Sequence, residues 1–306
     1  MTASLVITQL LNGLQVGVLL FLLAAGLTLV FGIMNFVNLA HGSLYMVGAY
    51  IAAATANASG SFLLAALVAV PGTMLVGLVV DRVVLRGLYT RDHLDQVLAT
   101  FGLVLFFNEA VRIVWGPSPL YAQAPAWLDG QVQLLGYTYA TYRLAIIVVG
   151  LAVAGFLAWL IGRTRVGMLI RAGATHPEMV SALGVNIRLL NMLIFSLGAA
   201  LAGLAGLMAG PIFSVQPGMG EPVLIQTLVV IIVGGIGSIR GAFLAALIVG
   251  VVDNMGRIFL PILMMKAMDP SVAQAAGPAL ASMLIYLLMA AVLAFKPEGL
   301  FPVKHG

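Results

Sequence analysis

Few side chains in this chain could do chemistry, and three of them fall together between two apolar stretches. Asn35, Asn38 and His41 lie close to Gly32 and Gly42. Amide and imidazole groups cost free energy when they are buried unpaired, so in an apolar setting they face protein or water. Either they line a solute path at a helix break, or they cap helix ends and join helices by hydrogen bonds. His41 has no second His, Cys or carboxylate at ligand spacing, so we expect no metal site.

Charged side chains gather in one other place, the segment 163–190. Charged residues make up only 8% of the chain, yet this segment holds four arginines and one glutamate: Arg163, Arg165, Arg171, Arg188 and Glu178. It lies between two apolar runs that could each cross a bilayer. A polar stretch held at a membrane face is typical of a docking site for a soluble partner.

A short helix is predicted inside this segment. Thr175 serves as its N-cap, Pro177 and Glu178 occupy its first turn, and Gly184 stops it. An apolar face then forms at the spacing i, i+3, i+4 from Met179, Ala182 and Leu183. Such a helix inserts into a cleft on a partner, or lies on anionic lipid headgroups.

Catalytic motifs are missing from the sequence. It contains no GxxxxGK[ST], so the chain does not bind ATP through a phosphate loop, and it contains no G-x-S-x-G or H-E-x-x-H. The run GGIGSIRG lacks the G-x-G-x-x-G spacing of a dinucleotide site. We expect no enzyme and no cofactor bound by this chain.

The elements that must position these residues are membrane helices. Of the 306 residues 62% are hydrophobic, and the mean hydropathy is +1.13. Apolar stretches of membrane-crossing length recur from end to end. The prediction is an all-α integral membrane protein, a polytopic bundle of eight to ten spans in one domain, 1–306. We expect one or two spans to be broken or re-entrant.

The positions of the spans predict an orientation. The expected spans are 9–30, 41–57, 62–80, 97–114, 142–162, 191–212, 223–236, 242–263 and 279–295. With strict alternation, ten basic residues fall on the side of segment 163–190: Arg82, Arg86, Arg91, Arg163, Arg165, Arg171, Arg188, Arg240, Lys296 and Lys304. Four fall on the other side: Arg112, Arg143, Arg257 and Lys266. Because basic residues accumulate in cytoplasmic loops, the N-terminus is expected outside and the C-terminus inside. The net charge of +4 therefore does not point to nucleic acid.

Two glycine-rich interruptions mark the expected breaks. The first, 31–42, contains Gly32 and Gly42; the second, 234–241, contains Gly234, Gly235, Gly237 and Gly241. Interrupted segments in corresponding positions of two halves are typical of a translocation site at the midplane. Alternatively, both are glycine-rich helix turns.

Helix packing and ion pairing can also be read from spacing. One expected span carries a stripe of small residues at a spacing of four, Gly198, Ala202, Gly206 and Gly210. Such a stripe favours close helix packing. We expect its neighbour to be a helix of this chain in preference to a second permease chain. Two ion pairs are expected near the outer face, Glu109 with Arg112 and Asp253 with Arg257. Glu221, followed by Pro222, suits the start of a helix.

Three passages together resemble a known family. They are GLTLVFGIMNFVNLAHGSLYMVGAY (26–50), the segment 163–190, and VVIIVGGIGSIRGAFLAALIVG (229–250). They are similar to the permeases of branched-chain amino acid ABC importers, most closely the H-type subunit, and the tail FKPEGLFP (295–302) also fits. The group covers importers of amides, urea and some aromatic acids as well.

The resemblance implies partners and a role for the segment 163–190. The partners are a second, M-type permease, two ATP-binding subunits that carry ATP and Mg²⁺, and an extracytoplasmic solute-binding protein. The importer docking pattern E-A-A-x3-G-x9-I-x-L-P places Glu178, Gly184 and Ile194 at its Glu, Gly and Ile positions. Met179 and Val180 replace the alanines, and the Leu-Pro end is missing. The residues implied in ATPase coupling are Arg171, Glu178, Ala182, Gly184 and Arg188.

The expected function is therefore that of a permease subunit in a bacterial inner membrane. The alternative is a stand-alone channel or a secondary transporter for a small polar solute. Ion-coupled carriers often place carboxylates deep in the membrane, whereas the carboxylates here are expected near span ends.

Overall fold

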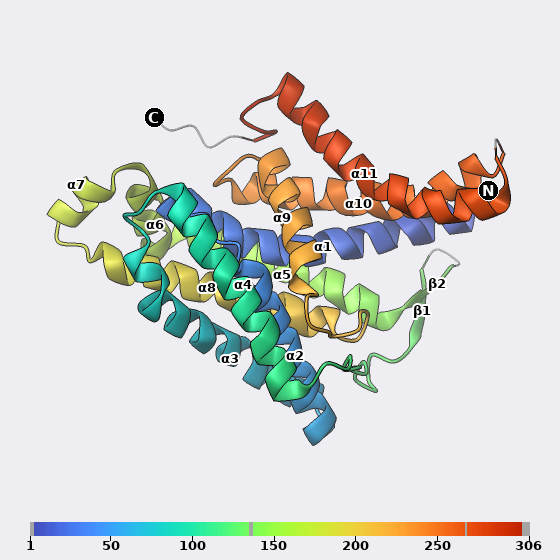
Figure 1. Ribbon diagram of the computed structural model, residues 1–306, viewed down its shortest axis with the longest axis horizontal. Helices are drawn as coiled ribbons and strands as arrows, with labels where there is room; N and C mark the ends of the chain where they lie inside the picture. The colour runs from blue at the N-terminus through green and yellow to red at the C-terminus, as the bar shows by residue number, and fades with distance from the viewer. Residues whose placement is uncertain (1–2, 135–136, 267, 302–306) are drawn as a thin grey trace.

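The computed structural model describes residues 3–134, 137–266 and 268–301, and this part of the chain is mostly helical (Figure 1). Its long helices, in chain order, are α1 (Ala3–Met34), α2 (His41–Ser59), α3 (Phe62–Val83), α4 (His93–Trp115), α5 (Thr141–Arg163), α8 (Ile187–Ala209), α9 (Gly220–Gly234), α10 (Ile239–Met264) and α11 (Pro270–Phe295). The shorter elements are η1 (Leu85–Gly87), α6 (Arg165–Thr175), α7 (Pro177–Ala182) and the strands β1 (Gln131–Leu134) and β2 (Tyr137–Ala140). The predicted all-α membrane fold is confirmed.

Seven of the described helices are long and apolar enough to cross a membrane: α1, α3, α4, α5, α8, α10 and α11. The other two expected spans fall on α2 and α9. Helix α9 has only 15 residues, about 22 Å at 1.5 Å per residue, which is shorter than the roughly 30 Å hydrocarbon layer. Helix α11 begins at Pro270, well before its expected start at 279.

The helices define two ends of the molecule. Helix α7 projects at one extreme, and the β-hairpin lies toward the other (Figure 1). We call these ends the α7 side and the hairpin side. The α7 side also holds the end of α1 and the turn between α9 and α10, because residues of these segments line one cavity together with α6. Lys304, one of the ten basic residues expected on the side of segment 163–190, lies outside the described residues.

Helices α1 and α8 form the centre of the bundle. Helix α1 is apolar all round its circumference and is almost fully buried from Val18 to Val30, as expected for a helix surrounded by others. It runs antiparallel to α10, and a Cβ on Gly13 or Gly17 would lie within 3 Å of α10 backbone at Val251 or Leu247. Glycine therefore sets the close approach of these two helices.

Local signals explain where several helices start. The side chains of Ser61, Asn186 and Ser238 accept hydrogen bonds from the first-turn N–H groups of α3, α8 and α10, at 3.1–3.3 Å. Side chains of this kind satisfy helical N–H groups that have no partner within the helix. Helix α2 ends at Gly60, whose φ is 66°, a left-handed conformation that glycine adopts without strain.

The segment between α4 and α5 contains the two β-strands of the described part of the chain. Strands β1 and β2 pair antiparallel, from Gln131 opposite Ala140 to Leu134 opposite Tyr137. An isolated bridge joins Leu120 to Val215, so this segment is tied to the loop before α9. The hairpin side is therefore ordered by backbone pairing between two connecting segments.

Candidate functional site

A tight elbow joins α5 to α6 on the α7 side. Thr164 caps α6: its Oγ1 accepts from the Gly167 N–H at 3.1 Å and donates to the Leu160 carbonyl at 2.5 Å. A Cβ on Gly167 would come within 2.5 Å of the Ile161 Cα, so only glycine fits. Arg171 Nη1 also donates to the Ile161 carbonyl. These contacts fix the direction of α6 relative to the membrane-length helix α5.

The opposite face of α6 packs against the bundle. Ile170 is buried, and a Cβ on Gly173 would meet the Leu190 side chain of α8 at 3.2 Å. Met168 and Arg171 are exposed on the remaining face. Helix α6 is therefore an amphipathic element held between the end of α5 and the start of α8.

Helix α7 follows directly and is bounded largely as expected. Pro177 occupies its first turn and Gly184, with φ 87°, lies just past its end. The Val185 N–H donates to the Val180 carbonyl at 3.3 Å, which closes the helix end as in a Schellman motif. One expectation was wrong: the N-cap is His176. Thr175 belongs to α6 and donates its Oγ1 hydrogen to the Arg171 carbonyl at 2.9 Å.

The apolar face of α7 is open to solvent. Met179 is 62% exposed and Leu183 79% exposed, while Ala182 and Glu178 are exposed beside them. Val180, on the other face, is buried and anchors the helix. Helix α7 projects from the bundle beyond the membrane-length helices (Figure 1). Large apolar side chains gathered on a projecting helix mark an interaction surface.

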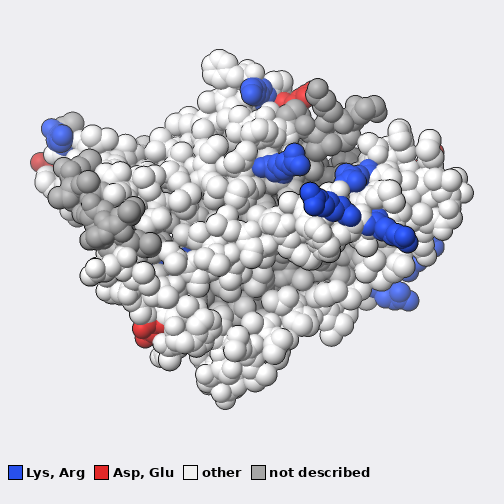
Figure 2. Space-filling model, turned by 180° about the vertical axis from the view of Figure 1, so that it is seen from behind, with Lys and Arg blue, Asp and Glu red and all other residues white. Residues whose placement is uncertain are grey.

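Two hollows continue this surface toward η1. One, of about 760 Å³, is lined by Glu178, Ser181 and residues 185–188. The other, of about 660 Å³, includes Arg82, Arg86 and Arg188 in its lining. Arg188 lines both hollows, so the surface runs from an apolar helix to a strongly basic region. On the face drawn in Figure 2, which is seen from behind, most Lys and Arg lie toward the end of the molecule where α7 lies.

The three polar residues near the first helix break have separate environments. Asn38 is buried and its Oδ1 accepts from the Ala40 N–H at 3.0 Å, one residue before α2 begins. His41 is also buried and its Nε2 lies 3.2 Å from the Leu23 carbonyl of α1. Asn35 is exposed, with φ 46°. The hydrogen bonds of Asn38 Oδ1 and His41 Nε2 fit helix capping and helix joining. Asn38 Nδ2 and His41 Nδ1 are buried without a partner among the described residues, as groups that line a solute path would be, so both alternatives stay open.

Helix α2 begins inside the bundle. His41 lies beside Gly26 of α1, and Gly26 packs against Gly198, the central residue of α8. A Cβ on Gly42 would lie 2.5 Å from the Gly220 carbonyl oxygen, at the start of α9. The first turns of α2 and α9 therefore meet, backbone against backbone, within the layer spanned by the long helices.

The two glycine-rich interruptions meet each other at the α7 side. A Cβ on Gly32, in the last turn of α1, would lie 2.6 Å from the Gly237 Cα in the turn after α9. Gly234 and Gly241 pack together across that turn. Phe301 lies at the same place: its N–H donates to the Gly234 carbonyl at 3.0 Å, and a Cβ on Gly235 would lie 2.9 Å from the Phe301 oxygen.

The small-residue stripe of α8 lies against helices of the same chain. Gly198 faces Gly26 of α1, and Gly206 faces the backbone of α2 at Tyr45. Ala202 is fully buried, whereas Gly210 has only looser neighbours. Gly203, which lies outside the stripe, packs against Thr73 of α3. The four-residue spacing did not predict the contact of Gly203, because α8 packs against other helices on more than one face.

Sequence reasoning also missed a polar contact between α4 and α9. Asn108 Nδ2 donates to Glu221 Oε1, and Asn108 Oδ1 accepts from the Gly218 N–H at 3.1 Å. A lone asparagine in an apolar helix gave no spacing signal. The two expected ion pairs are present, Arg112 with Glu109 at 3.0 Å and Arg257 with Asp253 at 2.9 Å.

Comparison with known proteins places this arrangement in context. Residues 9–293 match the family model described as the branched-chain amino acid transport system permease component. The chain is 32% identical to the permease protein BraD of the high-affinity branched-chain amino acid transport system of Pseudomonas aeruginosa, over 95% of this chain and 94% of the relative. It is 29% identical to LivH of Escherichia coli, of the same description, over 82% and 86%. It is also 25% identical to the ribose import permease RbsC of Escherichia coli, over 81% and 77%. No solved structure matches.

Proposed function

This chain belongs to the family of branched-chain amino acid transport permeases, and we propose that it is the H-type permease subunit of an ABC importer for branched-chain amino acids. A related small polar solute, such as an amide, urea or an aromatic acid, is the wider substrate class. Sequence likeness to permeases of branched-chain amino acid systems over most of the chain supports this proposal. The alternative, a stand-alone channel or secondary transporter, has no support from these relatives.

The partners follow from the same proposal. A second, M-type permease completes the membrane path, two ATP-binding subunits bind ATP and Mg²⁺, and an extracytoplasmic protein delivers the solute. The chain has no phosphate-binding loop of its own. Energy for transport must then reach it through a contact with the ATP-binding subunits.

The segment 163–190 is proposed as that contact. Helix α7 presents Met179 and Leu183 to solvent, and the elbow at Gly167 ties the neighbouring helix α6 to α5. A movement imposed on α7 would therefore be passed to a membrane-length helix. Glu178, Ala182, Gly184 and Arg188 belong to the docking surface. Arg171 acts differently, because its side chain joins α6 to α5.

The orientation of the chain in a bacterial inner membrane is part of the proposal. The α7 side is cytoplasmic and the hairpin side is outside, which places the N-terminus outside. The support is the clustering of Lys and Arg at the α7 side (Figure 2). Of the three polar residues, Asn38 and His41 are the ones we propose for the solute path, because Asn38 Nδ2 and His41 Nδ1 are buried without a hydrogen-bond partner among the described residues. Asn35 lines a separate cavity on the α7 side.

The observation that carries the proposal is the exposed apolar face of α7, and charge reversal beside it provides the test. We expect Glu178→Arg combined with Leu183→Asp to abolish copurification of the ATP-binding subunits with the tagged chain. Asp129→Arg is the matched control, because Asp129 is an exposed acid on the hairpin side. Equal copurification of both variants with wild type would remove α7 from the contact.

A further inference from the structure

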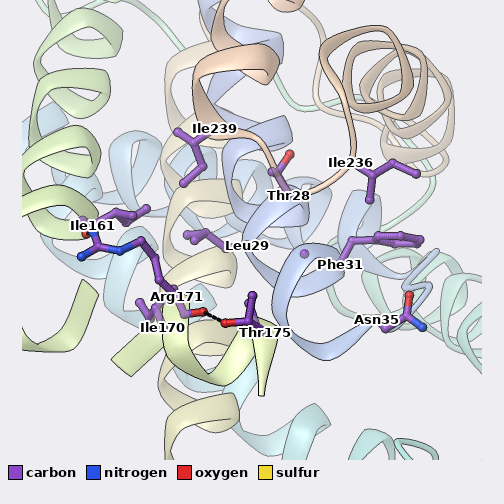
Figure 3. A pocket seen from close by; sticks show the side chains of 13 residues that line it. Thr28, Leu29, Phe31, Asn35, Ile161, Ile170, Arg171, Thr175, Ile236 and Ile239 are labelled. Carbon is purple, nitrogen blue, oxygen red and sulfur yellow. Dashed lines mark hydrogen bonds between the residues drawn. The ribbon is translucent and has the colours of Figure 1, made fainter. Parts of the chain in front are cut away.

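A cavity of about 580 Å³ lies beside α6, separate from the exposed face of α7. It is bounded by the end of α1, the end of α5, one face of α6 and the turn between α9 and α10. Figure 3 shows the side chains of these segments arranged around it. Asn35 and Arg171 line it and are exposed, so the cavity is open to its surroundings.

The lining combines an aliphatic wall with a few polar groups. Leu29, Ile161, Ile170, Ile236 and Ile239 supply the aliphatic part. The polar groups are the guanidinium of Arg171, the amide of Asn35 and the hydroxyls of Thr28 and Thr175. A mostly apolar cavity with a few converging polar groups is the usual form of a ligand site.

Thr28 gives an independent indication of a ligand. Its side chain is 1% exposed, it lines the cavity, and its Oγ1 has no hydrogen-bond partner among the described residues. A buried hydroxyl without a partner costs free energy. The hydroxyl has almost no accessible surface, so a ligand in the cavity would satisfy it after a small shift of the lining.

The charge of the lining residues favours an anionic ligand. Arg171 is the charged residue of the lining, and no Asp or Glu belongs to the lining. The guanidinium has five N–H donors, and the structure records one hydrogen bond, from Nη1 to the Ile161 carbonyl. The ammonium group of a free amino acid would have no carboxylate partner there, so a zwitterion fits poorly.

Among anionic ligands, the position of the cavity favours a lipid. It lies at the α7-side ends of α1 and α5 and the start of α10, helices of membrane-crossing length. In the proposed orientation, the hydrocarbon layer gives way to cytoplasmic headgroups at these helix ends. Basic pockets between helices on the cytoplasmic side bind anionic headgroups. We infer that this cavity binds an anionic phospholipid of the cytoplasmic leaflet, with its phosphate at Arg171 and an acyl chain along the aliphatic wall.

The bound lipid bridges α6 to α1 and to the turn between α9 and α10. It therefore stabilises α6, the element next to the proposed docking helix, against the rest of the bundle. The inference uses the cytoplasmic orientation of the α7 side. Lipid binding is measured without nucleotide or solute, so its result is independent of whether the chain transports branched-chain amino acids.

The test is native mass spectrometry of the full-length chain, purified with its partners, delipidated, and titrated with phosphatidylglycerol or phosphatidylcholine. We expect preferential binding of phosphatidylglycerol. Arg171→Gln, which removes the charge, and Ala174→Phe, which fills the cavity from α6, should each weaken it roughly tenfold. Arg91→Gln removes an exposed charge outside this cavity, and should leave binding unchanged.

Three outcomes would overturn the inference. They are equal binding of the two lipids, unchanged phosphatidylglycerol binding in both Arg171→Gln and Ala174→Phe, or displacement of phosphatidylglycerol by millimolar leucine. The last would assign the cavity to the free amino acid. Thr28→Val provides a second measurement if Ala174→Phe folds poorly, because it removes only the unpartnered hydroxyl and should also weaken binding.

Discussion

Gly42 and Gly220 meet backbone to backbone where α2 and α9 begin. Gly42 stands in the first turn of α2, and a Cβ there would lie 2.5 Å from the Gly220 oxygen and 2.9 Å from the Leu224 Cβ. Helices that begin inside the membrane layer leave N–H groups without helical partners, and they direct a positive dipole end inward. The close approach of these two starts is a structural requirement that only glycine meets.

Adding a methyl group at this contact should destabilise the protein. Gly42→Ala and Gly220→Ala should each lower the free energy of unfolding by about 2 kcal/mol, the usual cost of overpacking. The measurement is a thermal melt of the purified complex in detergent. Gly102→Ala is the control, since Gly102 is exposed on α4 with nothing within 4 Å of its Cβ position. Melting of all three variants at the wild-type temperature would contradict the contact.

Strain at the end of α7 should affect ATPase binding. Gly184 has φ 87° and open space around its Cβ position, so Gly184→Ala introduces backbone strain of about 1–2 kcal/mol without a clash. We expect roughly a tenfold weaker affinity for the ATP-binding subunits, measured by titration in nanodiscs. Gly60→Ala places similar strain at φ 66° on the hairpin side and should leave that affinity unchanged. An equal effect of the two substitutions would mean general destabilisation.

The two ion pairs should differ in strength because they differ in burial. The Asp253 side chain is 10% exposed and its Oδ1 has no partner, whereas Glu109 is 59% exposed. Arg257→Gln leaves a largely buried carboxylate without its cation and should cost about 2–3 kcal/mol, while Arg112→Gln should cost less than about 1 kcal/mol. Adding Asp253→Asn to Arg257→Gln should restore part of the loss. Equal melting of Arg257→Gln and Arg112→Gln would refute the burial argument.

The absence of cysteine makes the orientation easy to test. Ser118→Cys, between α4 and β1, and Ser181→Cys, on α7, each introduce one thiol at an exposed position. A membrane-impermeant maleimide should label Ser118→Cys in spheroplasts, and Ser181→Cys only in inside-out vesicles. Labelling with the sides exchanged would invert the proposed topology.

Local chemistry made part of the fold predictable. Pro177 and Gly184 bound α7 because proline and left-handed glycine act within a single helix turn. The positions of the apolar spans were predictable for the same reason, since each span follows from its own composition. Their ends were less so, as the start of α11 at Pro270 shows. The error at the N-cap of α7 arose because Thr175 can bond backward to Arg171 and continue α6.

Contacts between distant segments could not be derived from one sequence. The residues around Gly42 and Gly220 in the sequence do not indicate that the two glycines are in contact. The same holds for the hydrogen bond between Asn108 and Glu221. The interruptions at Gly32 and Gly237 were compared as corresponding positions of two halves, but they pack against each other. The arrangement of helices in space decides such contacts, and the spacing of residues along one helix does not report it.

The central claim is that this chain moves solute only when ATP-binding subunits act on it. The direct measurement is uptake of radiolabelled leucine into proteoliposomes that contain both permeases and the loaded binding protein, with and without the ATP-binding subunits and ATP. We expect uptake only with ATP and its subunits present, and its loss in Glu178→Arg combined with Leu183→Asp. Equal uptake without ATP-binding subunits would contradict the account and favour a channel or secondary transporter.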